Sequence, residues 1–205
     1  MNRRGLSFLE MLLAISITSI IGVAIASMMA AATNSLVSRD DGRSTAIRLA
    51  TTQVRLGAYI APSKCILEKS NTHLVLWLED SRDSNTAHVS EVRWIIHDDS
   101  TNTLSVLFVD FPNEWTQEMI DAADTECTPS TDYLTLLNSL QASELIDTIV
   151  LVDSMESCSF WINNQNPTDA TNVTIRFSLE SEFGQTNDAI VDETIRIHEP
   201  PSEQQ

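Results

Sequence analysis

The sequence predicts an α+β fold in which one long N-terminal helix packs on an antiparallel β-sheet head. Residues 11–32 form an apolar run without a charged side chain, and helical spacing continues to residue 60. From residue 63 onward, short apolar segments alternate with polar stretches, as they do in antiparallel sheets. The chain has 205 residues, of which 42% are hydrophobic and 20% charged, so it can form one packed domain with an appendage.

Charge is distributed unevenly along the chain. The formal net charge is -17, but residues 1–93 hold ten basic and eight acidic side chains, whereas residues 94–205 hold two basic and 21 acidic ones. Nucleic-acid binding through phosphate neutralisation needs clustered lysine and arginine, so no nucleic-acid partner is expected. The two parts of the chain are therefore predicted to face different surroundings.

The apolar run is long enough to cross a membrane. A helix of its 22 residues would span about 33 Å, close to the thickness of a bilayer hydrocarbon core. A cleaved secretory signal is one interpretation, because Arg3 and Arg4 precede the run and three alanines end it. The run is longer, however, than the roughly 7–15 apolar residues of such signals. An uncleaved signal anchor is a second interpretation, and neither one explains Glu10, a carboxylate whose placement near hydrocarbon costs free energy.

Residues 5–10, with the sequence Gly-Leu-Ser-Phe-Leu-Glu, follow a short basic leader and precede the apolar run. This segment resembles the cleavage and methylation motif of type IV prepilins and type II secretion pseudopilins. The resemblance combines a small residue before the cut, an apolar residue after it, glutamate at the fifth mature position and an uninterrupted apolar helix. It implies a pilin-like fold, with the long transmembrane helix packed on the sheet.

The resemblance also implies what the first motif residues do. A membrane-embedded prepilin peptidase would cut between Gly5 and Leu6, and Leu6 would then receive an N-methyl group, although the family usually has phenylalanine there. The chain would be a single-pass protein of the bacterial inner membrane, with a cytoplasmic N-terminus and a periplasmic head, until it is extracted into a filament. Counting lysine and arginine does not decide this orientation, since arginines lie on both sides of the apolar run.

Glu10 is predicted to be an assembly residue. Cleavage would create an ammonium group at Leu6, and Glu10 lies four residues further on, one helical turn away. When helices of neighbouring subunits bundle in a low-dielectric setting, the two charges can neutralise each other, and leaving either alone would be costly. The expected partners are therefore other pilin or pseudopilin subunits, the prepilin peptidase and the membrane.

The helix is predicted to continue to residue 60 and to pack its exported half on the head. Its apolar residues recur at spacings compatible with one helix face, and its arginines are available for another. The apolar set is Leu36, Val37, Ile47, Ala50 and Val54, and the basic set is Arg39, Arg43, Arg48 and Arg55. The basic set is either a solvated face or a stripe that pairs with the acidic heads of neighbouring subunits. Gly57 followed by Pro62 marks the predicted stop.

The head, residues 63–198, is predicted to consist mainly of strands. Expected strands cover residues 72–79, 89–97, 103–110, 148–152, 157–162, 173–180 and 189–197, and the first three would form a meander. Apolar residues recur at helical spacing in residues 114–123 and 132–145. The predicted organisation is completed by the leader (1–5), the membrane half of the helix (6–32), its exported half (33–60) and a flexible tail (199–205).

No catalytic motif stands out, so the chain is not expected to be an enzyme or to need a cofactor. The four histidines, which are His73, His88, His97 and His198, lack the spacing of metal ligands, and structural or solvated roles are expected for them. The acidic stretch 79–85 could place several oxygens around Ca²⁺, but it lacks a regular loop spacing. We interpret it as a polar turn, and no metal site is predicted.

The three cysteines all lie on the exported side of the apolar run, where oxidation is possible. An odd count leaves at least one thiol free or intermolecular. A disulfide between Cys65 and Cys127 would join the base of the helix to the helical insertion, while Cys158 stands in an apolar strand and fits a core position. The sequence does not rank the three possible pairings.

These features favour a structural, non-enzymatic subunit of a pilin-like filament. The size of the head and its order of strands and helices look most like the J-type minor pseudopilin or its counterpart among minor pilins. A type II secretion pseudopilus, a type IV pilus and a competence pilus share the leader and the helix, so the sequence does not decide which of these assemblies the subunit serves. The alternative is an exported binding or enzymatic domain held by an uncleaved signal anchor, in which Glu10 is incidental.

Overall fold

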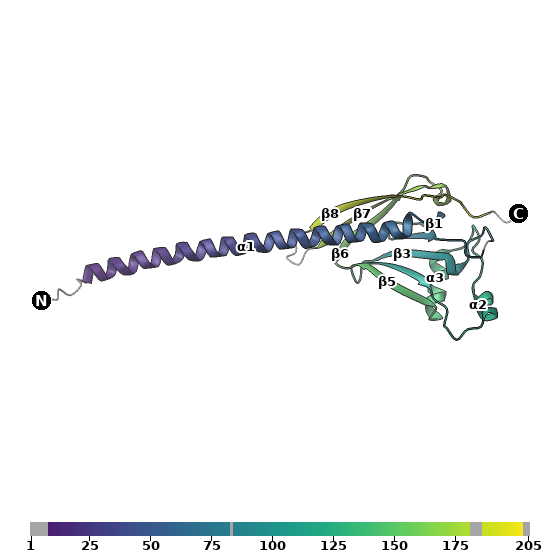
Figure 1. The fold of residues 1–205 in the computed structure, drawn as a ribbon, viewed down its shortest axis with the longest axis horizontal. Coiled ribbons are helices and arrows are strands. Elements are labelled where there is room, and N and C mark those ends of the chain that lie inside the picture. Colours follow the sequence, from purple (N-terminus) through teal and green to yellow (C-terminus); the bar gives the residue numbers. More distant parts are fainter. Residues whose placement is uncertain (1–7, 83, 181–185, 203–205) are drawn as a thin grey trace. The chain divides into compact units, whose positions relative to one another are not determined.

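The computed structural model describes residues 8–82, 84–180 and 186–202, and within the N-terminal helix it does not describe the side chains of residues 9, 10, 14 and 32–42. Contacts divide the chain into two compact units, Met1–Ser44 and Thr45–Gln205. Helix α1 (Phe8–Ile60) runs from the first unit into the second (Figure 1). We refer to the second unit as the head unit.

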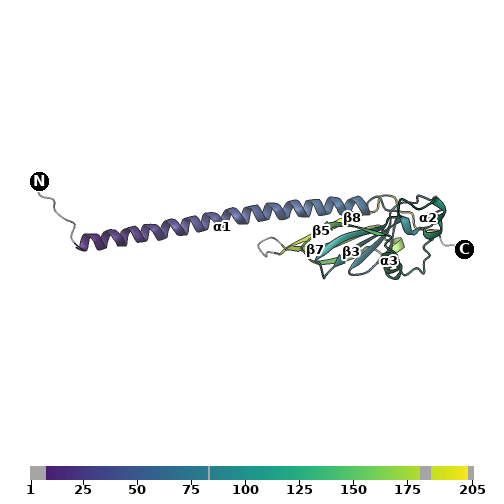
Figure 2. The same cartoon turned by 90° about the horizontal axis from the view of Figure 1, so that it is seen from below.

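The head unit contains two antiparallel sheets, where the sequence predicted a single one (Figure 2). The first sheet has the order β1-β2-β3-β4-β5 and the second the order β6-β7-β8. Their strands are β1 (Cys65–Lys69), β2 (His73–Trp77), β3 (Val92–Asp98), β4 (Thr103–Val109), β5 (Ile146–Val152), β6 (Met155–Ile162), β7 (Asn172–Glu180) and β8 (Thr186–Thr194). The chain passes from the first sheet to the second at Asp153 and Ser154, the latter at a φ of 52°, and β6 pairs with β7 and not with β5.

The predicted meander is confirmed in β2, β3 and β4, which pair in sequence order. The expected strand at residues 89–97 begins instead as a short 3₁₀ helix, Val89–Glu91, before β3. β1 was not predicted. It begins with three consecutive apolar residues, Cys65, Ile66 and Leu67, and ends with the charged pair Glu68 and Lys69, so the segment has no clear alternation.

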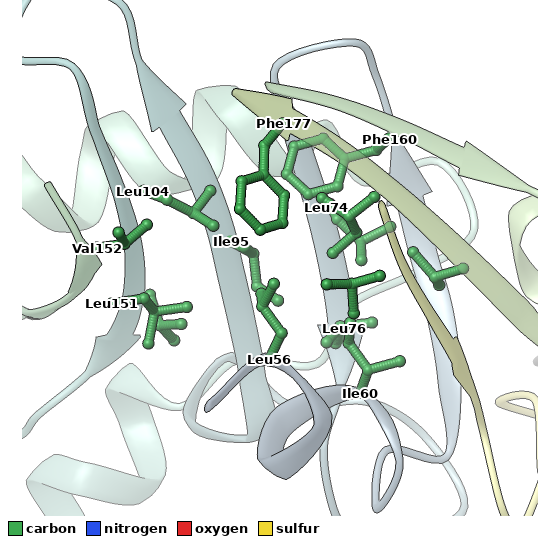
Figure 3. Close-up of a cluster of buried hydrophobic side chains, with 14 of the residues drawn as sticks. Leu56, Ile60, Leu74, Leu76, Ile95, Leu104, Leu151, Val152, Phe160 and Phe177 are labelled. Atoms are coloured by element: carbon green, nitrogen blue, oxygen red, sulfur yellow. The ribbon is translucent and has the colours of Figure 1, made fainter. Parts of the chain in front are cut away.

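The first sheet is apolar on both faces, because successive residues of its central strands point to opposite sides. In β2, Leu74 and Leu76 belong to one buried cluster, while Val75 and Trp77 belong to another. The first cluster fills the space between the first sheet, α1 and the second sheet (Figure 3). Its members include Leu56 and Ile60 from α1, Ile95 and Leu104 from the first sheet, and Phe160 and Phe177 from the second.

The second cluster covers the other face of the first sheet. Helix α3 (Tyr133–Ala142) supplies Tyr133, Leu137 and Leu140 to it. The indole nitrogen of Trp94 on β3 donates a hydrogen bond to the Tyr133 carbonyl oxygen, at 3.1 Å. The head unit therefore has three layers, with the first sheet in the middle.

Both predicted helical insertions are present, and each begins at a capping side chain. Thr116 accepts a hydrogen bond from the Met119 amide at the start of α2 (Gln117–Ala123). Asp132 accepts hydrogen bonds from two amides at the start of α3. Such caps satisfy amide groups that the first helical turn leaves without partners.

Helix α1 ends at Ile60, the bound that its sequence pattern suggested, and Gly57 lies inside its last turn. A Cβ at Gly57 would lie 3.0 Å from a carboxylate oxygen of Glu193 on β8, so the glycine permits close packing of strand and helix. Of the segment 199–205, the structure describes 199–202. There the Glu199 amide donates to the Lys64 carbonyl at 2.9 Å and the Ser202 amide to the Asn85 carbonyl at 2.8 Å, so these residues are held against the head.

Candidate membrane and assembly segment

Helix α1 carries the apolar run. Within it, Met11–Ala31 is long and apolar enough to cross a membrane, judged by length and composition, and none of it is buried within the chain. The large apolar side chains that it exposes are Met11, Leu12, Leu13, Ile15, Ile17, Ile20, Ile21, Val23, Ile25, Met28 and Met29. An apolar surface of this extent is unfavourable in water and marks a membrane or protein-interaction site.

The hydroxyl groups of this segment are satisfied by the helix itself. Ser16 donates to the Leu12 carbonyl at 2.8 Å, and Ser19 to the Ile15 carbonyl at 2.8 Å. Thr18 and Ser27 donate in the same way to carbonyls three residues earlier. A polar group without a hydrogen-bond partner costs roughly several kcal/mol of free energy in hydrocarbon. These hydrogen bonds therefore make the segment compatible with a bilayer core.

The residues of the N-terminal motif are placed only in part. Gly5 and Leu6 lie outside the described residues, so cleavage and N-methylation there stay predictions. Glu10 lies in α1, but its side chain is not among those described. The helical backbone at Glu10 agrees with the expectation that the helix extends through the motif region.

In the head unit, α1 packs through a different face from the one that the apolar spacing suggested. Ile47 and Val54 are 57% and 73% exposed, whereas Thr45, Thr52 and Leu56 are buried. Thr52 can be buried because its hydroxyl donates to the Arg48 carbonyl at 2.8 Å. The apolar residues Ile47 and Val54 thus remain largely exposed among the described residues of the head unit.

Two arginines of the basic set lie on the packed side of α1. Arg48 donates to a carboxylate oxygen of Asp153 at 2.7 Å and to the Glu180 carbonyl at 3.3 Å. Arg55 donates to the Leu151 carbonyl at 2.7 Å. Both therefore fasten α1 to its own head unit, which is a correction to the idea that Arg48 pairs with the head of a neighbouring subunit.

Each histidine makes a local contact in the head unit. The ring partners are Glu68 and Ser70 for His73, the Asp124 carbonyl for His88, the Met155 carbonyl and Asp99 for His97, and the Thr168 carbonyl for His198. Among residues 8–82, 84–180 and 186–202, no three metal-ligating side chains come together. The structure thus does not join the histidines into one site.

The acidic stretch 79–85 is organised by Asp80. Its carboxylate accepts hydrogen bonds from the amides of Ser84 and Asn85, at 3.1 and 3.2 Å, and lies 3.7 Å from the Lys64 ammonium. Asn85 adopts a φ of 58°, which asparagine tolerates better than most residues. These contacts account for the stretch as a turn.

A buried carboxylate that the sequence did not suggest organises the loop before β3. Glu91 is 1% exposed and accepts hydrogen bonds from the Trp77 indole at 3.0 Å and the Ser81 amide at 2.6 Å. Nearby, Arg82 donates to Asp124 at 2.7 Å and to Asp121 at 2.8 Å. This network holds α2 against the loop, and sequence spacing gave no sign of it because the partners come from separate segments.

The cysteines are free thiols in this structure, so the Cys65–Cys127 disulfide is not formed in it. Cys65 and Cys127 both belong to the second buried cluster, together with Tyr133. Burial raises the pKa of each of these thiols, and that of Cys158, to about 12. A thiol with so high a pKa carries almost no thiolate at neutral pH and reacts slowly.

The chain was also compared with known proteins. No family model, no curated protein and no solved structure matches it. Functional inference therefore depends on the N-terminal motif and on the geometry of α1 and the head unit.

Proposed function

We propose that this chain is a structural, non-enzymatic subunit of a filament of the type IV pilus or type II secretion pseudopilus class. A prepilin peptidase removes residues 1–5, and the mature chain stays in the bacterial inner membrane with its head in the periplasm. It enters the filament through its N-terminal helix, where Glu10 neutralises the N-terminal ammonium group of a neighbouring subunit.

The observation that carries this proposal is the exposed apolar surface of α1. A membrane anchor requires the segment Met11–Ala31 alone. Apolar exposure also occurs well beyond that segment, at Ile47 and Val54, seven residues apart and therefore on one helix face. Packing between helices of neighbouring subunits would bury this second surface, whereas a lone anchored domain leaves it in water.

Within this class we propose a minor subunit, of the J type in a secretion pseudopilus or its counterpart in a pilus. The head unit supports this with two sheets and two helical insertions, and residues 6–61 lack proline.

The mature N-terminus tests the proposal. The full chain is expressed in a bacterium with a prepilin peptidase and in a strain without it, and mass spectrometry determines where the purified chain begins. We expect an N-methylated Leu6 in the first strain and an unprocessed chain in the second. A chain that keeps Met1, or that begins at Thr33, in both strains would favour the alternative of a signal anchor or a secretory signal.

Glu10→Ala separates processing from assembly. The variant keeps the cleavage site, so we expect normal processing, but its neighbours' ammonium groups lose their counter-charge and incorporation into filaments should fail. Ser7→Ala is a matched control in the same motif. Recovery of Glu10→Ala in purified filaments at the control's level would rule out the assembly role.

A further inference from the structure

Four of the six lysines and arginines in residues 63–205 form no ion pair with a described residue, and two of these four, Lys69 and Arg176, lie close together. Residues 63–205 carry six basic and 26 acidic side chains, so each cation has many potential partners. Lys64 and Arg82 use them and form ion pairs. Lys69 and Arg176, in contrast, form no ion pair with any residue that the structure describes.

Both of these cations lie over one exposed aromatic ring. The Lys69 ammonium is 5.8 Å and the Arg176 guanidinium 6.0 Å from the centroid of Trp161, which is 58% exposed. Lys69 ends β1 of the first sheet, whereas Trp161 and Arg176 belong to the second sheet, so the cations meet at the junction of the two sheets. The ring attracts the cations but does not neutralise their charge.

An exposed isoleucine extends this surface. Ile190 on β8 lies opposite Arg176 on β7, so both point to the same face of the second sheet, and Ile190 is 59% exposed. We refer to Lys69, Trp161, Arg176 and Ile190 as the Trp161 patch. Tryptophan and arginine are the residue types that most often contribute binding energy at protein interfaces.

Helix α2 offers the complementary surface. It has no buried residue, and Met119 on it is 48% exposed. Glu118 on α2 and Glu114, three residues before α2 begins, are exposed as well, and neither forms an ion pair within the described part of the chain. The contacts of Arg82 with Asp121 and Asp124 hold α2 in place, so these groups form a fixed acidic and apolar surface.

We infer that the Trp161 patch of one chain binds α2 of a second copy, with Lys69 and Arg176 facing Glu114 and Glu118. A contact between two Trp161 patches would bring four cations together, whereas α2 offers carboxylates to them. Helix α2 lies at one end of the head, apart from the second sheet (Figure 1), so one copy can make both contacts at once. Such a head-to-tail contact adds copies in an open series. The inference does not rest on leader processing and can fail independently of it.

Zero-length crosslinking tests the contact directly. A carbodiimide joins lysine to carboxylate groups, and the chain has two lysines, Lys64 and Lys69. Unlabelled and isotopically labelled full chains are mixed in detergent micelles, crosslinked and analysed by mass spectrometry. Lys64 is the internal control, since it lies 2.9 Å from Glu199 and should crosslink within its own chain.

For Lys69 we expect mixed-label crosslinks to Glu114 or Glu118. Lys69 crosslinks that stay within one chain, that reach other carboxylates of a second chain, or that are missing while Lys64 reacts, would each overturn the inference.

Charge reversal provides the second test. Arg176→Glu and Glu118→Lys should each weaken the salt-sensitive self-association of the full chain, by about tenfold or more, and mixing the two variants should restore it. Arg196→Glu is the matched control, because Arg196 is an exposed head cation outside the patch. The urea midpoint of each variant verifies that it folds. Equal association of Arg176→Glu, Arg196→Glu and the unaltered chain would refute the contact.

Discussion

Single residues of the head unit differ widely in what they contribute, and Glu91 shows why. Its carboxylate accepts five hydrogen bonds, from the Trp77 indole, the Ser81 amide and hydroxyl, the Arg82 amide and the His88 amide. All five donors would lose their acceptor if this side chain were removed, and the Trp77 indole, which is buried, could not turn to water instead. A buried donor without an acceptor costs about 1–3 kcal/mol, which is more than a satisfied hydrogen bond contributes.

Glu91→Ala should therefore lower the free energy of unfolding by at least about 3 kcal/mol. Glu91→Gln retains one acceptor oxygen and should lose less. Urea unfolding of the full chain in detergent, followed by tryptophan fluorescence, measures both. Glu118→Ala, which removes an exposed carboxylate, is the control and should change stability by no more than about 0.5 kcal/mol. Similar losses for Glu91→Ala and Glu118→Ala would contradict this account.

Two exposed aspartates make the stability of the head dependent on acid pH. Hydrogen bonds from Ser100 lower the pKa of Asp98, and those from the Thr135 amide and hydroxyl lower the pKa of Asp132, in both cases from an ordinary value of 3.8. A folded-state pKa below the unfolded one favours the folded state above the unfolded pKa. This contribution should be complete above pH 3.8 and disappear as the pH falls through the lowered values.

The measurement is the urea midpoint between about pH 7 and pH 2. We expect Asp98→Asn and Asp132→Asn to show a smaller decline on acidification than the unaltered chain. Asparagine can still cap α3, so the second variant removes the charge while it keeps the cap. An unchanged pH profile in the double variant would show that other carboxylates cause the decline.

At the scale of elements, α1 has two apolar surfaces with different roles in the head unit. Leu56 is fully buried in the first cluster, whereas Val54 is 73% exposed. Leu56→Ala should lower the free energy of unfolding by about 2–5 kcal/mol, because it leaves a cavity between three elements. Val54→Ala should change it by no more than about 0.5 kcal/mol.

The same pair of variants distinguishes folding from assembly. If the exposed surface of α1 packs against neighbouring subunits, Val54→Ala should reduce incorporation into filaments although its head is as stable as the unaltered one. Filament yield is measured beside urea unfolding. A large loss of stability in Val54→Ala would mean that this residue belongs to the core.

The sequence predicted the positions of the helices better than it predicted which face of α1 is buried. The short helices were predicted because their apolar spacing and their starts at Thr116 and Asp132 are local signals. The packed face of α1 was not predicted, because the buried residues Thr45 and Thr52 have polar side chains. Thr52 can be buried because its hydroxyl donates to the Arg48 carbonyl of the preceding turn, a bond that only the folded helix shows.

The whole head unit shows where sequence reasoning ends. The same strand segments could form one sheet or two. Which of these arrangements forms depends on the path of the chain at Asp153 and Ser154 and on which strands pair with each other. Pairing partners far apart in sequence leave no local pattern. The Trp161 patch was missed for this reason, because Lys69 and Trp161 are 92 positions apart in the sequence.

The layers of the head unit should unfold together. The first sheet contributes Leu74 and Leu76 to one cluster and Val75 and Trp77 to the other, so neither cluster can open without disturbing the strand between them. Phe160 on β6 is 1% exposed in the first cluster. Phe160→Ala should therefore cost about 3–5 kcal/mol and weaken the second cluster as well, although it contacts only the first.

Hydrogen exchange of the full chain in detergent can measure this coupling. Of the two buried clusters, only the second contains side chains of α3. We expect Phe160→Ala to lower the protection of the slowest amides in α3 and in β7 by equal free energies. Trp161→Ala is the matched control, since it removes the neighbouring aromatic ring from an exposed position. If α3 kept its protection in Phe160→Ala while β7 lost it, the second sheet would unfold separately, and the first sheet would not couple the two clusters.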